Sequence, residues 1–120
     1  MPSQPDRIPS DTSRDDDISP RALSARLRDD AAPLTLLDVR EPEEWDIVHL
    51  PHARLMSLGS FPEAAVSLDR DAELVVYCHH GARSAAAVAW MRAQGFTQVR
   101  NLAGGIDRWS LEVDPSVRRY

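Results

Sequence analysis

Short apolar runs alternate with stretches of helical pattern along most of this 120-residue chain. The run from Leu34 to Val39 is typical of a strand that is buried on both faces of a sheet. The alanine-rich run from Ser84 to Ala93 indicates a helix packed closely on such a sheet, and Gly95 suits its end. This alternation predicts an α/β layer fold with a mainly parallel sheet. The predicted strands are residues 34–39, 53–56, 73–77 and 96–101, and the predicted helices are residues 20–30, 41–45, 60–67, 83–93 and a short one ending near 109.

The first predicted helix has a clear start. Ser19 can cap it and Pro20 fits its first turn. Leu23 and Leu27 are spaced to form one buried face, and the helix is expected to end near Asp30.

The length of the chain suits one domain with a buried core and is too short for two ordinary domains. Residues 1–17 offer almost nothing apolar to bury, so we expect a disordered leader there. The domain proper is expected over residues 18–114, and a C-terminal tail over residues 115–120.

The only cysteine, Cys78, stands where a predicted strand ends and a predicted helix begins. Ligands of open parallel sheets bind at the carboxyl ends of the strands. A short loop and a helix start in this position can aim consecutive backbone N–H groups at the sulfur. Gly81 lets the loop curl, Arg83 adds a positive charge for an incoming anion, and Ser84 can cap or orient the loop. We therefore predict that Cys78 is the nucleophile and that the substrate is held by His79, His80, Gly81, Ala82, Arg83 and Ser84.

The thiolate of such a cysteine needs substantial stabilisation. An ordinary thiol has a pKa of about 8.5, and lowering it by two units takes roughly 2.7 kcal/mol. One helix terminus typically supplies about 0.3–1 kcal/mol, whereas each hydrogen bond to a charged group contributes about 1.5–3 kcal/mol. Two or three N–H groups aimed at the sulfur of Cys78 would therefore suffice, and the backbone is expected to be the main source of activation.

Other interpretations of the same segment are open. A free cysteine is often just a small buried residue that ends a core strand. His79 and His80, together with His49 and His52, suggest a metal site with Cys78, but adjacent loop residues point in divergent directions and no spaced ligand pair completes a tetrahedral set. We predict no metal ion, and we place His79 and His80 at the mouth of the site.

Asp38 and Arg40 lie at the carboxyl end of a second predicted strand, at the same edge of the sheet. They could act in catalysis, but a structural ion pair or a hydrogen bond that braces the loop is the favoured interpretation. Gly104 and Gly105 predict a tight turn that lets the backbone approach the loop after Cys78.

The net charge of −5 and a pI near 5.2 argue against nucleic acid or an anionic membrane as the main partner. A single cysteine cannot form an internal disulfide, and neither end of the sequence has a signal segment or a long apolar span. We therefore expect a cytoplasmic protein whose partner is small or proteinaceous.

Four motifs follow one another along the chain. They read Leu37-Asp38-Val39-Arg40-Glu41-Pro42-Glu43-Glu44-Trp45, His49-Leu50-Pro51-His52-Ala53, Val76-Tyr77-Cys78-His79-His80-Gly81-Ala82-Arg83-Ser84 and Asn101-Leu102-Ala103-Gly104-Gly105-Ile106-Asp107-Arg108-Trp109. In order and spacing, they resemble the rhodanese-like sulfurtransferase family over about residues 18–112.

This resemblance implies a three-layer rhodanese-like fold, with a mostly parallel five-stranded sheet and helices on both faces. It also implies a persulfide on Cys78, loaded by thiosulfate or a persulfide donor and unloaded to cyanide, a thiol or a sulfur-carrier protein, with no metal or organic cofactor. The alternative is a rhodanese-fold binding or regulatory module with little turnover. The presence of Cys78, Gly81 and Arg83 together argues against that alternative.

Three comparisons with family patterns refine this expectation. Relatives of phosphatase or arsenate-reducing type have one more residue between the cysteine and the arginine, so the loop of four residues here fits a sulfane sulfur better than a tetrahedral oxyanion. The family usually has Gly-His-Ile-Pro-Gly-Ala where this chain has Val48-His49-Leu50-Pro51-His52-Ala53, and both glycines are lost. The segment from Trp109 to Tyr120 is similar to the end of rhodanese domains fused to adenylating enzymes, which suggests a sulfur-carrier protein as a partner.

Overall fold

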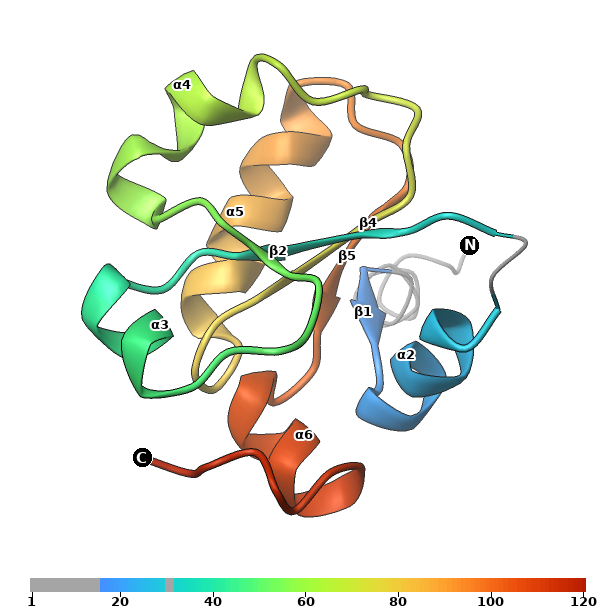
Figure 1. Ribbon diagram of the computed structural model, residues 1–120. Helices are drawn as coiled ribbons and strands as arrows, with labels where there is room; N and C mark the ends of the chain where they lie inside the picture. The colour runs from blue at the N-terminus through green and yellow to red at the C-terminus, as the bar shows by residue number, and fades with distance from the viewer. Residues whose placement is uncertain (1–15, 30–31) are drawn as a thin grey trace, which may run out of the picture.

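The computed structural model describes residues 16–29 and 32–120, and within them a five-stranded sheet forms the centre of the molecule (Figure 1). The strands lie in the order β1-β5-β4-β2-β3, and each neighbouring pair is parallel. Because the strands are parallel, their carboxyl ends meet at one edge. The strands are β1 (Asp17–Ile18), β2 (Thr35–Asp38), β3 (Arg54–Leu55), β4 (Leu74–Tyr77) and β5 (Val99–Leu102).

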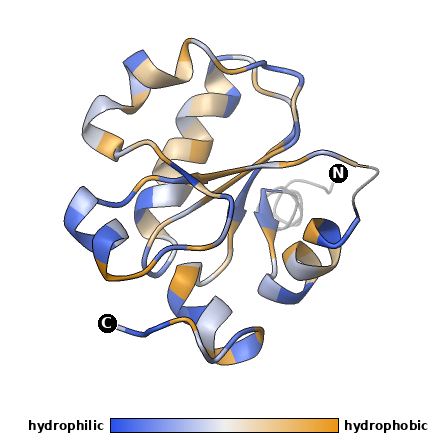
Figure 2. Ribbon diagram, in the orientation of Figure 1, coloured by the Kyte–Doolittle hydropathy of each residue, from blue (hydrophilic) through white to orange (hydrophobic). Residues whose placement is uncertain are grey.

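Helices cover both faces of this sheet, as predicted. Helices α4 and α5 supply the apolar cluster on one face, and α2 and α6 supply the cluster on the other. Helix α3 lies at the carboxyl edge, has no buried residue and is coloured hydrophilic over most of its length (Figure 2). The helices are α2 (Pro20–Leu27), α3 (Pro42–Ile47), the 3₁₀ turn η1 (Leu58–Ser60), α4 (Phe61–Ala65), α5 (Ala82–Ala93) and α6 (Gly105–Glu112).

The central strands are buried on both faces, which explains their continuous apolar sequences. Leu36 and Val75 pack into the cluster beside α2 and α6, whereas Leu37 and Val76 pack into the cluster beside α4 and α5. Successive side chains of a strand point to opposite faces, so an uninterrupted apolar run fills both cores. The three-layer α/β fold predicted from the sequence is confirmed.

The start of the domain differs in detail from the prediction. Strand β1 begins at Asp17, one residue before the predicted boundary, and pairs with Asn101 and Leu102 of β5. Residues 1–15 of the predicted leader lie outside the described residues. The prediction for Leu27 was wrong: Leu23 is fully buried, but Leu27 is 39% exposed because it is the last residue of α2.

The C-terminal residues pack on the domain. Val117 is buried in the cluster beside α6, and the Ser110 hydroxyl donates a hydrogen bond to its carbonyl oxygen at 2.6 Å. From there the chain runs back toward α3 and the carboxyl edge of the sheet (Figure 1). Within the described part of the chain, no helix has the length and apolar character needed to cross a membrane.

Candidate active site

The loop that follows β4 turns directly into α5. We call residues 78–84 the cysteine loop. Cys78 directly follows β4 and is 1% exposed, and Ala82 is the exposed first residue of α5. Gly81 caps the helix with a φ of 110°, a left-handed conformation that favours glycine. The sulfur therefore sits under the amino-terminal turn of α5, as the sequence predicted.

Several hydrogen-bond donors of the cysteine loop face this sulfur. The amide of Gly81 lies 3.1 Å from Sγ of Cys78, and the amide and hydroxyl of Ser84 lie at 3.4 Å and 3.3 Å. Burial of Cys78 raises the pKa of its thiol, but the Ser84 hydroxyl and the amides of Ser84, Gly81 and Arg83 outweigh burial and lower the pKa overall. The site therefore favours the thiolate, which is the nucleophilic form.

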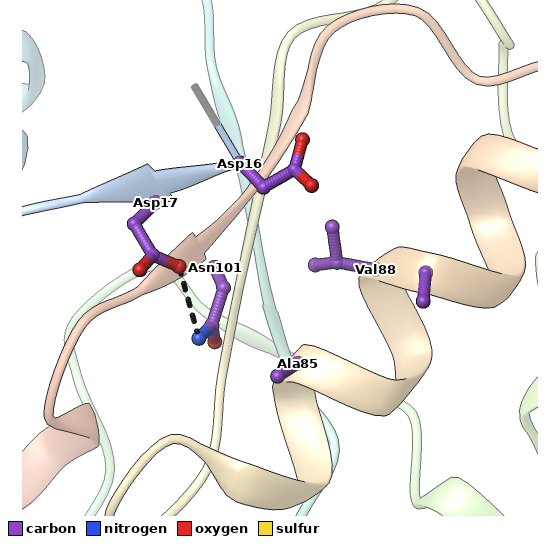
Figure 3. Close-up of a pocket in the computed structure, with 6 residues that line it drawn as sticks. Asp16, Asp17, Ala85, Val88 and Asn101 are labelled. Atoms are coloured by element: carbon purple, nitrogen blue, oxygen red, sulfur yellow. Dashed lines mark hydrogen bonds between the residues drawn. The ribbon is translucent and has the colours of Figure 1, made fainter. Parts of the chain in front are cut away.

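Asn101 of β5 supports the cysteine loop from behind. Oδ1 of Asn101 lies 2.5 Å from the Ser84 hydroxyl. Nδ2 of Asn101 lies 3.3 Å from the carbonyl oxygen of Gly81 and 3.4 Å from Oδ1 of Asp17. Figure 3 shows the amide of Asn101 directed at Asp17, beside the start of α5. Asn101 also lines a cavity of about 260 Å³ together with Asp16, Asp17, Ala85, Val88 and Ala89. The side chain of Asn101 thus contacts both this cavity and the hydroxyl that reaches the sulfur.

The start of α6 holds the backbone of the cysteine loop. The amide of Ile106 donates to the carbonyl of Cys78 at 2.9 Å, and the amide of Asp107 donates to the carbonyl of His79 at 3.1 Å. Gly105 has a φ of 65°, and a Cβ on it would lie 2.4 Å from the carbonyl oxygen of His79. The Gly104-Gly105 turn therefore brings the backbone against the cysteine loop, in agreement with the close approach predicted from sequence.

Arg83 does not stand free at the mouth of the site. Both terminal nitrogens of its guanidinium contact the carboxylate of Glu44 in α3, at 2.7 Å and 2.9 Å. The hydrogen bond from Arg83 lowers the pKa of Glu44 to about 2, with burial opposing it and the Tyr120 hydroxyl assisting. Glu44 is therefore ionised at neutral pH, and an incoming anion must share Arg83 with it.

Asp38 and Arg40 form a fully buried ion pair at the carboxyl end of β2. Nη2 of Arg40 lies 2.6 Å from Oδ2 of Asp38, and Nε of Arg40 lies 2.9 Å from Oδ1. Arg40 also donates to the carbonyl of Val48 at 2.7 Å, and the Ser57 hydroxyl donates to the carbonyl of Arg40 at 2.8 Å. None of these contacts involves the sulfur of Cys78. The ion pair therefore holds the loops around the site in place.

His79 and His80 lie on the outer side of the cysteine loop. Their rings stack at a centroid distance of 3.9 Å, and Tyr120 stacks on the other face of His79, also at 3.9 Å. Burial, with the neighbouring His80, lowers the pKa of His79, so this ring is mostly neutral at pH 7.

A metal ion fits these histidines poorly. Ligand atoms of His79, His80 and Asp107 lie within 4.8 Å of one another. However, stacked rings direct their lone pairs side by side rather than toward one point, and the Asp107 carboxylate already binds Arg119 at 2.8 Å. The sequence-based expectation that Cys78 works without a metal stays a prediction.

The loop between α3 and β3 shows the effect of the lost glycines. His52 has a φ of 66°, and among the described residues it is the one non-glycine residue with positive φ. Val48 has a φ of −169°, which is extended backbone open to any residue. Of the two positions where the family usually has glycine, only the one at His52 requires the left-handed conformation.

Comparisons with known proteins identify the family of the chain. The sequence model of the rhodanese-like domain matches residues 19–112. The chain belongs to the rhodanese-like domain family. A rhodanese-related protein from Thermoplasma volcanium has a similar structure, with a TM-score of 0.74 and 31% identity over 87% of this chain and 98% of that one.

Several curated relatives have names that mention sulfur transfer. The chain is 41% identical over 105 residues to a probable adenylyltransferase/sulfurtransferase, MoeZ, of Mycobacterium tuberculosis, covering 86% of this chain and 26% of that protein. It is 34% identical to the thiosulfate sulfurtransferase GlpE of Ectopseudomonas mendocina, covering 77% of this chain and 82% of that protein. The chain spans from about a quarter to about half of the length of the first relatives that it matches.

Sequence reasoning missed three residues of this site. Glu44 was noted only as part of a helix and a family motif, although a glutamate there is the partner of Arg83. Asn101 could have been found as a polar residue inside a predicted buried strand. Tyr120 gave no local signal, because its position depends on how the chain returns after α6.

Proposed function

We propose that this protein is a sulfurtransferase that carries a sulfane sulfur on Cys78. The observation that supports this most directly is the set of donors from Gly81 and Ser84 around the sulfur, because they stabilise a thiolate and then a persulfide without a metal or cofactor. The names of the relatives favour the same chemistry.

The proposed donor is a small anionic sulfur compound such as thiosulfate. The thiolate of Cys78 attacks the outer sulfur of thiosulfate; a new S–S bond forms to Sγ, the S–S bond of thiosulfate breaks, and sulfite leaves with the electron pair. In the second step, cyanide or a thiolate attacks the outer sulfur of the persulfide, and Cys78 leaves as the thiolate. No net oxidant or reductant is needed.

The cysteine loop suits both steps. Its amides already point at the sulfur, so negative charge there is stabilised without rearrangement. Arg83 lies at the mouth of the site and attracts the donor anion, which then shares the guanidinium with Glu44. His79, His80 and Ala82 form the remaining wall past which donor and acceptor approach.

A sulfur-carrier protein is the proposed macromolecular acceptor. The support is the similarity of the C-terminal segment to rhodanese domains joined to adenylating enzymes, and a relative named as a putative sulfur carrier protein, YrkF, of Bacillus subtilis. Persulfide transfer from the loaded protein to a carrier would be followed by mass spectrometry in a reconstituted mixture, and its absence would remove this partner.

Steady-state kinetics with thiosulfate and cyanide test the enzyme. A double-displacement cycle predicts parallel lines in double-reciprocal plots, and Cys78→Ala should abolish thiocyanate formation. The rival function is a binding module with little turnover, favoured by the ion pair that occupies Arg83. Turnover no faster than that of Cys78→Ala would support the module.

A further inference from the structure

The C-terminal segment, residues 117–120, packs against the cysteine loop. Arg119 pairs with Asp107 of α6 at 2.8 Å, and the Tyr120 ring then lies on His79 with an interplanar angle of 8°. Val117, at the start of this stretch, is buried. Three separate contacts thus fix residues 117–120 beside the mouth of the site, where the sequence had suggested a tail.

The hydroxyl of Tyr120 joins two charged groups. It accepts a hydrogen bond from Nη1 of Arg40 at 2.9 Å and donates one to Oε2 of Glu44 at 2.7 Å. Both directions are fixed, because a guanidinium can only donate and a carboxylate can only accept. Burial raises the pKa of Tyr120 to about 12, so the hydroxyl keeps its proton at neutral pH.

One side of this bridge is rigid and the other reaches the mouth. Arg40 is fully buried and held by Asp38, so it gives the Tyr120 hydroxyl a fixed anchor. Glu44, on the other side, holds both terminal nitrogens of Arg83. A continuous chain of polar contacts therefore runs from the buried ion pair to the arginine of the cysteine loop.

We propose that Tyr120 is a positioning residue that holds Glu44 on Arg83 and thereby limits the positive charge that the Cys78 site presents to anions. The carboxylate of Glu44 occupies the end of the Arg83 guanidinium, which leaves fewer of its N–H groups for an oxyanion, and a paired charge attracts an anion less than a free one. Tyr120 thus favours donors or acceptors whose binding does not require an unpaired arginine. This role rests on the function proposed above, since it refines how the donor is selected.

Alkylation of Cys78 by two reagents measures this charge without any sulfur transfer. Iodoacetate is an anion and iodoacetamide is neutral, so the ratio of their second-order rate constants reports the potential at the sulfur. A change in the reactivity of the thiol itself affects both reagents and cancels in the ratio. The measurement therefore stays informative even if the protein takes no sulfur from thiosulfate.

Tyr120→Phe removes the hydroxyl and keeps the ring on His79. We expect the iodoacetate-to-iodoacetamide ratio to rise about twofold to fivefold, since Glu44 is then less firmly held on Arg83. Glu44→Gln should raise the ratio at least as much. The double variant should match Glu44→Gln alone, because Tyr120 acts through Glu44.

The matched control is Ser116→Ala, which removes another hydroxyl next to the C-terminal segment, one that donates to Oδ1 of Asp114 at 2.6 Å, and leaves Arg40 and Glu44 untouched. Its ratio should equal that of the unaltered protein. An unchanged ratio in Tyr120→Phe, an equal rise in Ser116→Ala, or a further rise in the double variant beyond Glu44→Gln would each overturn the proposal. Thermal unfolding of every variant identifies any that has lost its fold. If Tyr120→Phe does not fold, Tyr120→Trp takes its place, because tryptophan also keeps an aromatic ring and lacks the hydroxyl. The iodoacetate-to-iodoacetamide ratio of Tyr120→Trp should rise as well.

Discussion

The hydroxyl of Ser84 lies 3.3 Å from the sulfur of Cys78, six residues earlier in the chain. Both side chains are almost fully buried, so the hydrogen bond is shielded from water. The same hydroxyl lies 2.5 Å from Oδ1 of Asn101 and has one proton to give. Formation of a thiolate at Cys78 draws that proton toward the sulfur.

Ser84→Ala should therefore raise the pKa of Cys78. A hydrogen bond to a charged group contributes about 1.5–3 kcal/mol, which corresponds to roughly one to two pKa units. Because the hydrogen bonds to its sulfur lower the pKa of the unaltered Cys78 thiol, its alkylation rate rises with pH at a lower pH than the rate of the same thiol without them. In Ser84→Ala, the alkylation rate should begin to rise only at a higher pH.

The measurement is the rate of iodoacetamide alkylation as a function of pH. Ser110→Ala is the control, because Ser110 is also buried but donates to the carbonyl of Val117 rather than to sulfur. Overlapping profiles for Ser84→Ala and the unaltered protein would contradict the role assigned to this hydroxyl.

Gly105→Ala should damage both stability and reactivity. The new Cβ would lie 2.4 Å from the carbonyl oxygen of His79 and 2.6 Å from that of Cys78, and the positive φ alone costs an alanine about 1–2 kcal/mol. Since both contacts are backbone atoms, the cysteine loop must move. We expect a loss of more than about 2 kcal/mol in the free energy of unfolding and slower alkylation of Cys78.

Chemical denaturation checks this expectation, with Gly59→Ala as the control. A Cβ on Gly59 meets nothing within 4 Å, and its φ is not positive, so the control should be nearly neutral. Equal stability of the two variants would show that the approach of α6 to the cysteine loop is not tight.

His52→Gly should stabilise the protein. His52 adopts a φ of 66°, which strains a residue with a Cβ, and glycine removes that strain while adding freedom to the unfolded chain. The net gain expected is about 0.5–1 kcal/mol. Val48→Gly, at the other position where the family usually has glycine, should destabilise, because Val48 is extended and packs against the core.

The midpoints of chemical unfolding of the two variants should move in opposite directions. If His52→Gly is destabilising like Val48→Gly, the side chain of His52 makes contacts worth more than the strain of its backbone.

The layers of the fold could be predicted from the sequence because its central strands are buried on both faces. Runs such as Leu34 to Val39 leave few alternatives to a parallel sheet, and Gly95 marks a helix end by its own conformation. Strand β1 escaped detection because its two residues, Asp17 and Ile18, carry no periodic pattern and are defined by pairing with β5. Leu27 was misplaced because periodicity does not show where a helix leaves the core.

The site divides in the same way. Cys78, Gly81 and Ser84 lie within seven consecutive residues, so a loop argument could place their donors around the sulfur. Glu44 and Tyr120 come from distant parts of the chain and meet Arg83 and His79 only through tertiary packing. Spacing in the sequence gives no access to contacts of that kind.

The central claim is that Cys78 carries sulfur as a persulfide, and intact mass spectrometry after treatment with thiosulfate tests it most directly. The account predicts that the protein gains the mass of one sulfur atom, that cyanide removes it, and that Cys78→Ala gains nothing. An unaltered protein that shows no mass increase, although its thiol is alkylated rapidly at neutral pH, would contradict the account.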